Sequence, residues 1–515
     1  MQSRRFDGKI NAIWNIFLAS LAIFAVLAWM LLTPEKKSVG INSDDAAPPL
    51  LVFCAPAIKA PVEAIAREYE REFKTQIQLQ YGPSQTLLTS AEIAKRGDVF
   101  LPADDSYNEL ARAKNLIAET IPLVRMHAVI VVKKGNPAAI KSLADLLRDN
   151  VKVALAGDAA AIGKLSHQAL EKRGKWAALS KKAVFKISVS DVGNDVKLGA
   201  VDVGIIWHSM LPQYETLEGV DDPDLKEVTA KASAAVLRSA KNPTAALHFM
   251  RYLAARDKGL VEFKKSGYDT EEGDAWAPVP ELKLFAGAML RPAIEKTIGD
   301  FEAREGAKVT RIYNGCGILV SQMRASKNGA LPDAYFACDK SFMTQVEDLF
   351  LDAEDVSQNQ LVILVQKGNP HGIDQLKDLG KPGLRLGIGH EKQCALGALT
   401  STTFKTSGVF DGVMKNVKVQ SATGDLLVNQ LLTGSLDAVV AYVSNAAAAA
   451  DKLDAIRIDI PCALAVQPMA LSKESANKNL ATRLMDALRS APSRERFESQ
   501  GFTWKYGVKP LIDAK

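Results

Sequence analysis

The sequence predicts an α/β protein that consists of two tandem copies of one domain. Short apolar segments alternate with amphipathic helical stretches along most of the 515 residues, a pattern typical of sheets covered by helices. Motifs of the first half return in the same order in the second half. The composition, 47% hydrophobic and 24% charged, is that of ordinary globular domains and excludes a largely disordered chain.

The strands expected in the first half are short apolar runs. After the first of them, a helix is predicted, because its apolar residues recur at helical spacing on one face: Val62, Ile65, Ala66, Tyr69 and Phe73. Strands separated by such helices predict parallel sheets with helices on both faces, and ligands beyond the carboxyl ends of the strands. The expected strands are residues 50–54, 76–81, 99–103, 128–133, 151–155, 183–188 and 203–207.

The duplication is visible in matched motifs that keep their order along the chain. The clearest pairs are Lys134-Gly135-Asn136-Pro137 with Lys367-Gly368-Asn369-Pro370, Gly199-Ala200-Val201-Asp202 with Gly434-Ser435-Leu436-Asp437, and Asp98 with Asp333. A repeat of this length is a whole domain, not one turn of a solenoid. An acidic, proline-containing linker is predicted at residues 271–281, between domains at 50–270 and 282–510.

The N-terminus carries a predicted membrane anchor. Residues 10–32 contain no charged side chain, and about 20 helical residues cross the hydrocarbon layer of a bilayer. Residues 1–9 contain Arg4, Arg5 and Lys9, which places them on the cytoplasmic side. Residues 33–49 form a polar tether, and everything beyond Leu32 is expected outside the cytoplasm. The alternative is a signal peptide that is cleaved from the mature chain.

Charge and motif content argue against several classes of protein. Lys and Arg exceed Asp and Glu by five without a basic tract, so we expect no nucleic-acid partner. The six histidines are scattered, and the common metal-site, hydrolase and phosphate-loop motifs are absent from the sequence. We therefore predict no catalytic residues, no metal and no cofactor, although a nucleophilic role for Cys316 stays open. His208, beside Trp207 at a strand end, is the histidine of most interest.

Both halves resemble one known family. The first half contains V-F-C-A-P-A-I-K, Y-G-P-S-Q-T-L, G-D-V-F-L-P-A-D and G-A-V-D-V-G-I-I-W, and the second contains L-F-A-G-A-M-L-R, Y-N-G-C-G-I-L, D-A-Y-F-A-C-D, K-Q-C-A-L-G and G-S-L-D-A-V-V-A-Y. In this order the motifs resemble the extracytoplasmic solute-binding proteins of ABC importers, specifically the molybdate/tungstate-binding group. The resemblance implies periplasmic-binding-protein-like (type II) domains, each with two α/β lobes and a hinge. It also implies a location on the periplasmic side of the bacterial inner membrane and an ABC permease as partner.

The resemblance also implies an oxyanion held in the cleft of each half. The family's binding positions fall in the first half on Ala57, Ser84, Ile162, Val192 and Trp207, and in the second on Met289, Cys316, Leu396, Leu427 and Tyr442. Neither half keeps the full set of hydroxyl groups, so each could bind another oxyanion, bind weakly or serve as a scaffold. Lys59 and Arg291 either attract the anion or are solvated residues at a helix start. Ser84, Trp207 and Tyr442 could equally be ordinary turn or core residues.

The cysteines are distributed unevenly. Cys54 is alone in the first half, whereas Cys316, Cys338, Cys394 and Cys462 lie in the second, where they allow up to two disulfides. Two interpretations are open: a structural disulfide or small buried thiols, and a cleft that binds a thiophilic species or closes through a redox-sensitive bridge.

Two functions follow from these expectations. The first is a membrane-tethered receptor that delivers molybdate, tungstate or a related oxyanion to an ABC permease. The second is a ligand sensor or scaffold that transports nothing and presents its duplicated lobes to a partner protein.

Overall fold

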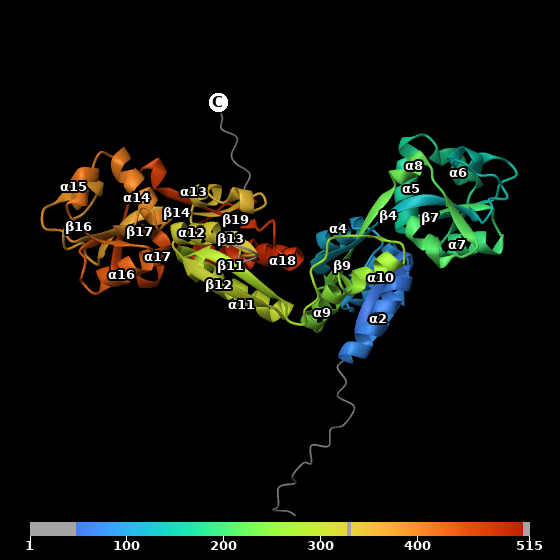
Figure 1. The fold of residues 1–515 in the computed structure, drawn as a ribbon, viewed down its shortest axis with the longest axis horizontal. Coiled ribbons are helices and arrows are strands. Elements are labelled where there is room, and N and C mark those ends of the chain that lie inside the picture. The colour runs from blue at the N-terminus through green and yellow to red at the C-terminus, as the bar shows by residue number, and fades with distance from the viewer. Residues whose placement is uncertain (1–47, 327–330, 508–515) are drawn as a thin grey trace, which may run out of the picture. The chain divides into compact units, whose positions relative to one another are not determined.

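The computed structural model describes residues 48–326 and 331–507 of the chain. Two separate hydrophobic cores form, one from residues between Leu50 and Tyr268 and one from residues between Leu282 and Trp504. Each half has its own ten-stranded arrangement of sheets, and helices pack against these sheets (Figure 1). The prediction of two tandem α/β domains is therefore confirmed.

The first half begins with the predicted strand and helix, and the helix buries Val62, Ile65, Ala66 and Tyr69 as expected. Its strands are β1 (Leu50–Cys54), β2 (Ile77–Tyr81), β3 (Val99–Leu101), β4 (Ile117–Lys133), β5 (Val153–Ala156), β6 (Val184–Lys186), β7 (Val203–Trp207), β8 (Leu217–Val220), β9 (Thr229–Leu237) and β10 (Asp269–Thr270). Its helices are α2 (Lys59–Phe73), α3 (Ser84–Ala94), α4 (Ser106–Ala113), α5 (Ala161–Lys172), α6 (Trp176–Lys182), α7 (Val189–Leu198), α8 (Pro223–Lys226), α9 (Pro243–Leu253) and α10 (Gly259–Lys265), with short 3₁₀ turns η1 (Pro56–Ile58), η2 (Leu143–Leu147) and η3 (His208–Gln213).

The second half repeats this order of elements. Its strands are β11 (Glu281–Gly287), β12 (Lys308–Asn314), β13 (Ala334–Phe336), β14 (Glu354–Gln366), β15 (Leu386–Gly389), β16 (Val417–Ser421), β17 (Ala438–Tyr442), β18 (Leu453–Arg457), β19 (Leu464–Leu471) and β20 (Thr503–Trp504). Its helices are α11 (Arg291–Glu305), α12 (Cys316–Ala325), α13 (Lys340–Thr344), α14 (Ala395–Thr406), α15 (Phe410–Met414), α16 (Gly424–Leu432), α17 (Val443–Ala446), α18 (Lys478–Leu488) and α19 (Ala491–Ser499), with 3₁₀ turns η4 (Ala288–Leu290), η5 (Glu347–Leu349), η6 (Leu376–Gly380), η7 (Ala447–Ala449) and η8 (Pro461–Ala463).

The two halves share one strand order, β2-β1-β3-β9-β4-β7-β5-β6 in the first and β12-β11-β13-β19-β14-β17-β15-β16 in the second. In each half one long strand belongs to two sheets. The start of β4 pairs with β9, and from Ala128 onward it pairs with β7. In the second half β14 changes partner in the same way at Leu361. Each half thus has two lobes joined at this strand, and we call the lobe with the half's first strand lobe A and the other lobe B.

The prediction of purely parallel sheets is wrong. Pairs such as β1–β2 and β5–β6 are parallel, but β9 runs antiparallel to both β3 and β4, and β4 runs antiparallel to β7. The expected strand set also omitted β8, β9, β10 and the first part of β4. The mixed arrangement arises because β4 carries the chain from lobe A to lobe B and β9 pairs back along its lobe A portion.

The most visible repeat motifs shape loops and strand ends. Asp98 and Asp333 each accept a hydrogen bond from a neighbouring strand's N–H, those of Leu51 and Lys283, at 2.9 and 2.7 Å. The Asn136 side-chain amide donates to the Ile140 carbonyl oxygen at 2.7 Å and accepts from the Ile140 N–H at 2.9 Å. Asn369 makes the same two hydrogen bonds with Ile373. These motifs recur because the fold needs them in both halves.

Among the described residues, no helix is both long and apolar enough to cross a membrane. The predicted anchor at residues 10–32, the segment before it and residues 33–47 of the tether lie outside the described residues.

Candidate ligand site at the lobe junctions

In both halves, helix N-termini from the two lobes face each other. In the first half the N–H of Gln85, at the start of α3 in lobe A, donates to the Ala159 carbonyl just before α5 in lobe B, at 3.2 Å. In the second half the N–H of Gly317 in α12 donates to the Gln393 carbonyl just before α14, at 3.0 Å. The first N–H groups of a helix have no acceptor within the helix, and the helix dipole makes this end favourable for an anion.

Glycines allow the close approach of these loops. A Cβ on Gly163 would lie 2.2 Å from the Gly157 carbonyl oxygen, and one on Gly397 would lie 2.3 Å from the His390 carbonyl carbon, so both helix starts in lobe B need glycine. A Cβ on Gly317 would lie 2.1 Å from the Lys392 oxygen, on the opposite lobe. The backbone contact between the lobes of the second half therefore depends on the absence of a side chain at this position.

The predicted first-half residues come from both lobes: Ala57 and Ser84 from lobe A, and Ile162, Val192 and Trp207 from lobe B. Ala57 in η1, Ile162 in α5 and Val192 in α7 are buried, and they offer no polar side-chain atom. Ser84, 1% exposed at the start of α3, accepts a hydrogen bond from the Ala103 N–H at 3.1 Å, which leaves its own hydroxyl proton available. Trp207, fully buried at the end of β7, has an indole N–H without a hydrogen-bond partner among the described residues.

The second half has a comparable arrangement. Met289 in η4, Leu396 in α14 and Leu427 in α16 are buried and apolar. Tyr442, 2% exposed at the end of β17, has a hydroxyl that finds no partner within residues 48–326 and 331–507. Burial raises the pKa of Tyr442 well above its ordinary value, and the nearby Asp339 and Cys394 add to this effect. The hydroxyl therefore stays protonated and can donate.

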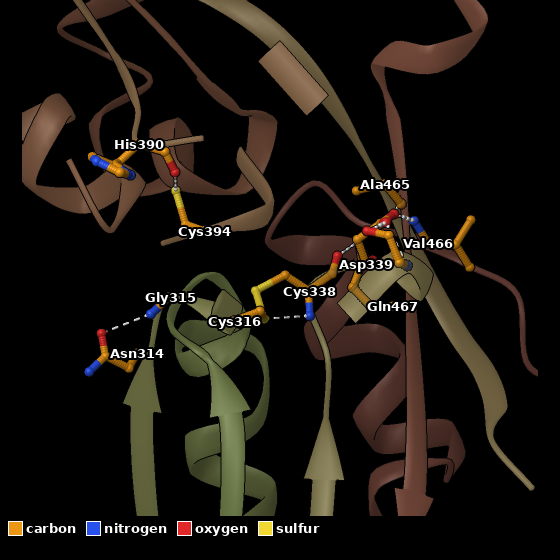
Figure 2. The surroundings of a disulfide bond; sticks show 11 residues. Asn314, Gly315, Cys316, Cys338, Asp339, His390, Cys394, Ala465, Val466 and Gln467 are labelled. Carbon is orange, nitrogen blue, oxygen red and sulfur yellow. Dashed lines mark hydrogen bonds between the residues drawn. A yellow bond between two sulfur atoms is a disulfide. The ribbon is translucent and has the colours of Figure 1, made fainter. Parts of the chain in front are cut away.

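Cys316 is joined to Cys338 in a disulfide that links the start of α12 to the segment just after β13 (Figure 2). Both residues belong to lobe A, so the bridge does not fasten one lobe to the other. Cys54, Cys394 and Cys462 are free thiols, so the five cysteines of the described chain form one disulfide. Cys394, in lobe B, contacts the carbonyl oxygens of His390 and Ser421, at 3.6 and 3.4 Å. Since Cys316 has no thiol proton, it could offer a ligand its backbone N–H.

At four matched interior positions the second half is polar where the first half is apolar, a difference that sequence analysis missed. Gln467 is fully buried, accepts from the Ser357 hydroxyl at 2.9 Å and donates to the Cys338 carbonyl at 3.1 Å. The Tyr335 hydroxyl and both amide atoms of Asn359 are buried without a partner in the described part of the chain. Strand pairing puts Ser357, Asn359, Gln467 and Tyr335 at the positions of Val124, Met126, Ala232 and Phe100.

The two predicted anion-attracting cations pack against aromatic rings. Lys59 Nζ lies 4.7 Å from the ring centre of Tyr81, and the Arg291 guanidinium lies 5.6 Å from that of Tyr313. Each tyrosine donates its hydroxyl to a glutamate of the preceding helix, Tyr81 to Glu63 of α2 and Tyr313 to Glu295 of α11, at 2.7 Å. The structure thus gives both cations a packing role, and attraction of an anion stays a prediction.

Comparison with known proteins follows this division into halves. The family model of bacterial extracellular solute-binding proteins matches residues 50–269 and again 282–503. A Haemophilus influenzae protein provisionally named a binding protein is 29% identical over 228 residues, 43% of this chain and 90% of that protein. The molybdate-binding protein ModA of Mycobacterium tuberculosis is 26% identical over 226 residues, 43% of this chain and 84% of ModA. The solved periplasmic molybdate-binding protein of Azotobacter vinelandii is 17% identical, with a TM-score of 0.36 over 42% of this chain and 98% of that one. The chain belongs to the family of bacterial extracellular solute-binding proteins, with one copy of the family domain in each half.

Proposed function

We propose that this solute-binding protein captures a tetrahedral oxyanion, molybdate or tungstate, at a lobe junction and delivers it to an ABC permease. The observation that carries the proposal is the pair of facing helix N-termini in each half, next to a buried donor that lacks an acceptor. Backbone N–H groups and neutral side-chain donors can hold an oxyanion in a water-poor site without a balancing cation. The name of the mycobacterial relative supports molybdate as the ligand.

The second half is the stronger candidate for the ligand site. Its Tyr442 hydroxyl and Asn359 amide are both buried donors that have no partner among the described residues. An unsatisfied buried polar group costs about 1–3 kcal/mol, and a ligand that accepts its hydrogen bond removes this cost. In the first half, the buried donors without a partner among the described residues include the Trp207 indole N–H and the hydroxyls of Ser166 and Ser209.

Ligand capture in this proposal proceeds by movement of the lobes about β4 or β14. In the structure, the Gly317 N–H donates to the Gln393 carbonyl of the opposite lobe. An oxyanion entering between the lobes would take over such N–H groups and bridge the two helix starts. Because the ligand then contacts both lobes, it shifts the equilibrium between open and closed forms toward closure.

We expect isothermal titration calorimetry of the full-length chain to show saturable binding of molybdate or tungstate, with a micromolar or lower Kd. Sulfate, phosphate and arsenate serve as comparison ligands, because they are also tetrahedral but differ in size and protonation. Preference for one oxyanion identifies the cargo. Failure of all five to bind would contradict the proposal.

We further propose that residues 10–32 anchor the protein in the inner membrane, because this stretch is uncharged and long enough to span it. The protein should stay in the membrane pellet after alkaline carbonate extraction, and the mature chain should retain its N-terminal residues in mass spectrometry. A mature N-terminus beyond residue 32 would instead identify a cleaved signal peptide.

A further inference from the structure

Three side chains that are far apart in sequence meet where the two lobes of the first half join. His127 is the last β4 residue paired with β9, and Ala128 is the first paired with β7. His208 directly follows Trp207, at the start of η3. Asp269 lies in β10, which pairs with β4 at Arg125. The cluster therefore draws one side chain from each of three segments at the lobe crossover.

The three side chains of the cluster bring potential ligand atoms close to one another. The imidazole rings of His127 and His208 are stacked with centres 3.7 Å apart and an angle of 9° between their planes. His208 Nε2 lies 3.6 Å from Asp269 Oδ2, and one ligand atom from each of the three residues lies within 4.8 Å of the others. Bonds of about 2.0–2.2 Å in a tetrahedral site place ligand atoms roughly 3.4 Å apart. The two imidazoles, which are parallel in the structure, must also turn out of their stack so that both lone pairs point at one ion.

The surroundings of His208 suit a ligand role. His208 Nδ1 faces the His127 backbone: in one tautomer it donates to the His127 carbonyl oxygen at 3.3 Å and leaves the lone pair of Nε2 facing Asp269, and in the other it accepts from the His127 N–H at 3.1 Å. Metal binding at Nε2 requires the first tautomer. Metal-binding histidines commonly have such a carbonyl acceptor behind them. Arg125, the nearest cation along β4, is held by Glu271 at 2.5 and 3.0 Å.

We propose that His127, His208 and Asp269 bind one Zn²⁺ ion, with water as the fourth ligand. Two imidazoles and one carboxylate form a ligand set that Zn²⁺ accepts, and His208 and Asp269 reach it from segments on either side of β4. The corresponding positions of the second half, by strand pairing, are Gln360, Val443 and Thr503. The site is therefore specific to the first half. A metal bound there would hold together the segments around His127, where β4 passes from lobe A to lobe B.

The test is calorimetric titration of the full-length chain, freed of metal with EDTA and dialysed, with ZnCl₂. We expect one Zn²⁺ per chain, and we expect His208→Gln and Asp269→Asn each to weaken binding at least tenfold. His167→Gln is the matched control, since His167 also lies near two carboxylates, Asp158 at 2.9 Å and Glu171 at 3.5 Å, but has no second imidazole in its group. This variant should bind Zn²⁺ like the unmodified chain.

Absence of saturable Zn²⁺ binding would overturn the proposal, as would binding that both cluster variants retain. Circular dichroism in EDTA checks that each variant is folded. A second measurement needs no variant: Co²⁺ bound to the unmodified chain should show the intense visible absorption of a four-coordinate site. A spectrum of Co²⁺ in water alone would equally overturn the proposal. None of these outcomes depends on oxyanion binding, so the two proposals can fail separately.

Discussion

The double variant Cys316→Ser/Cys338→Ala should lower the unfolding temperature of the second half and leave that of the first half unchanged. The disulfide closes a loop across a sequence separation of 22 residues. For a loop of this length, the chain-entropy model gives about 3 kcal/mol of stabilisation. In a domain of this size that corresponds to a shift of about 6–12 °C. The two separate cores should give two resolvable transitions in differential scanning calorimetry.

The double variant is chosen because it reproduces what the first half already has. There Ser84 and Ala103 occupy the matching positions, and the Ala103 N–H donates to the Ser84 hydroxyl at 3.1 Å. In the second half the Cys338 N–H lies 3.0 Å from the Cys316 sulfur, so the bridge adds a covalent bond to the same backbone contact. The variant should keep the hydrogen bond and lose the covalent constraint.

Cys462→Ser is the control for this experiment. Cys462 is a partly exposed free thiol whose sulfur contacts the Thr403 hydroxyl at 3.7 Å, and its replacement should move neither transition appreciably. If the double variant left both transitions in place, the disulfide would have no stabilising role. An equal shift of both would mean that the halves unfold as one cooperative unit.

The elements predicted correctly from sequence are those whose signal is local. The strand 50–54 is predicted by a run of apolar residues, and the helix after it by apolar residues at helical spacing. The structure has both elements. Strand β9, Thr229–Leu237, was missed because it is rich in alanine and carries few β-branched residues. The first part of β4 was missed because it contains Pro122 and an irregular register. Its apolar and polar residues therefore do not alternate regularly along the strand.

The candidate site was only partly predictable for a different reason. Trp207 and Tyr442 were named as candidates through the resemblance to the family, and the structure puts both at the end of a strand, where ligands of such sheets lie. The polar positions of β14, such as Asn359, resemble an exposed edge strand in sequence, and their burial follows from pairing with β19. The histidine cluster gave no local signal, because His127 and His208 are 81 residues apart.

Tyr442→Phe should lower oxyanion affinity by about 10-fold to 150-fold while leaving the second half as stable as before, or slightly more stable. The hydroxyl is buried and has no partner among the described residues, so its removal costs no hydrogen bond to any of them. A hydrogen bond to a charged ligand is worth about 1.5–3 kcal/mol, and each 1.4 kcal/mol is a factor of about ten in Kd. Calorimetric titration and thermal unfolding of the same variant measure the two effects.

The pair of readouts separates a ligand role of Tyr442 from a packing role. If the ring and hydroxyl only filled the core, loss of affinity would come with loss of stability, because packing defects destabilise the folded state. Trp207→Phe is the matched variant for the first half, since it removes the unpartnered indole N–H at the equivalent strand end. If Trp207→Phe weakened oxyanion binding and Tyr442→Phe left it unchanged, the ligand site would be in the first half. Unchanged affinity in both variants would exclude these two donors from the site, and an oxyanion bound there would be held by backbone N–H groups of the facing helices.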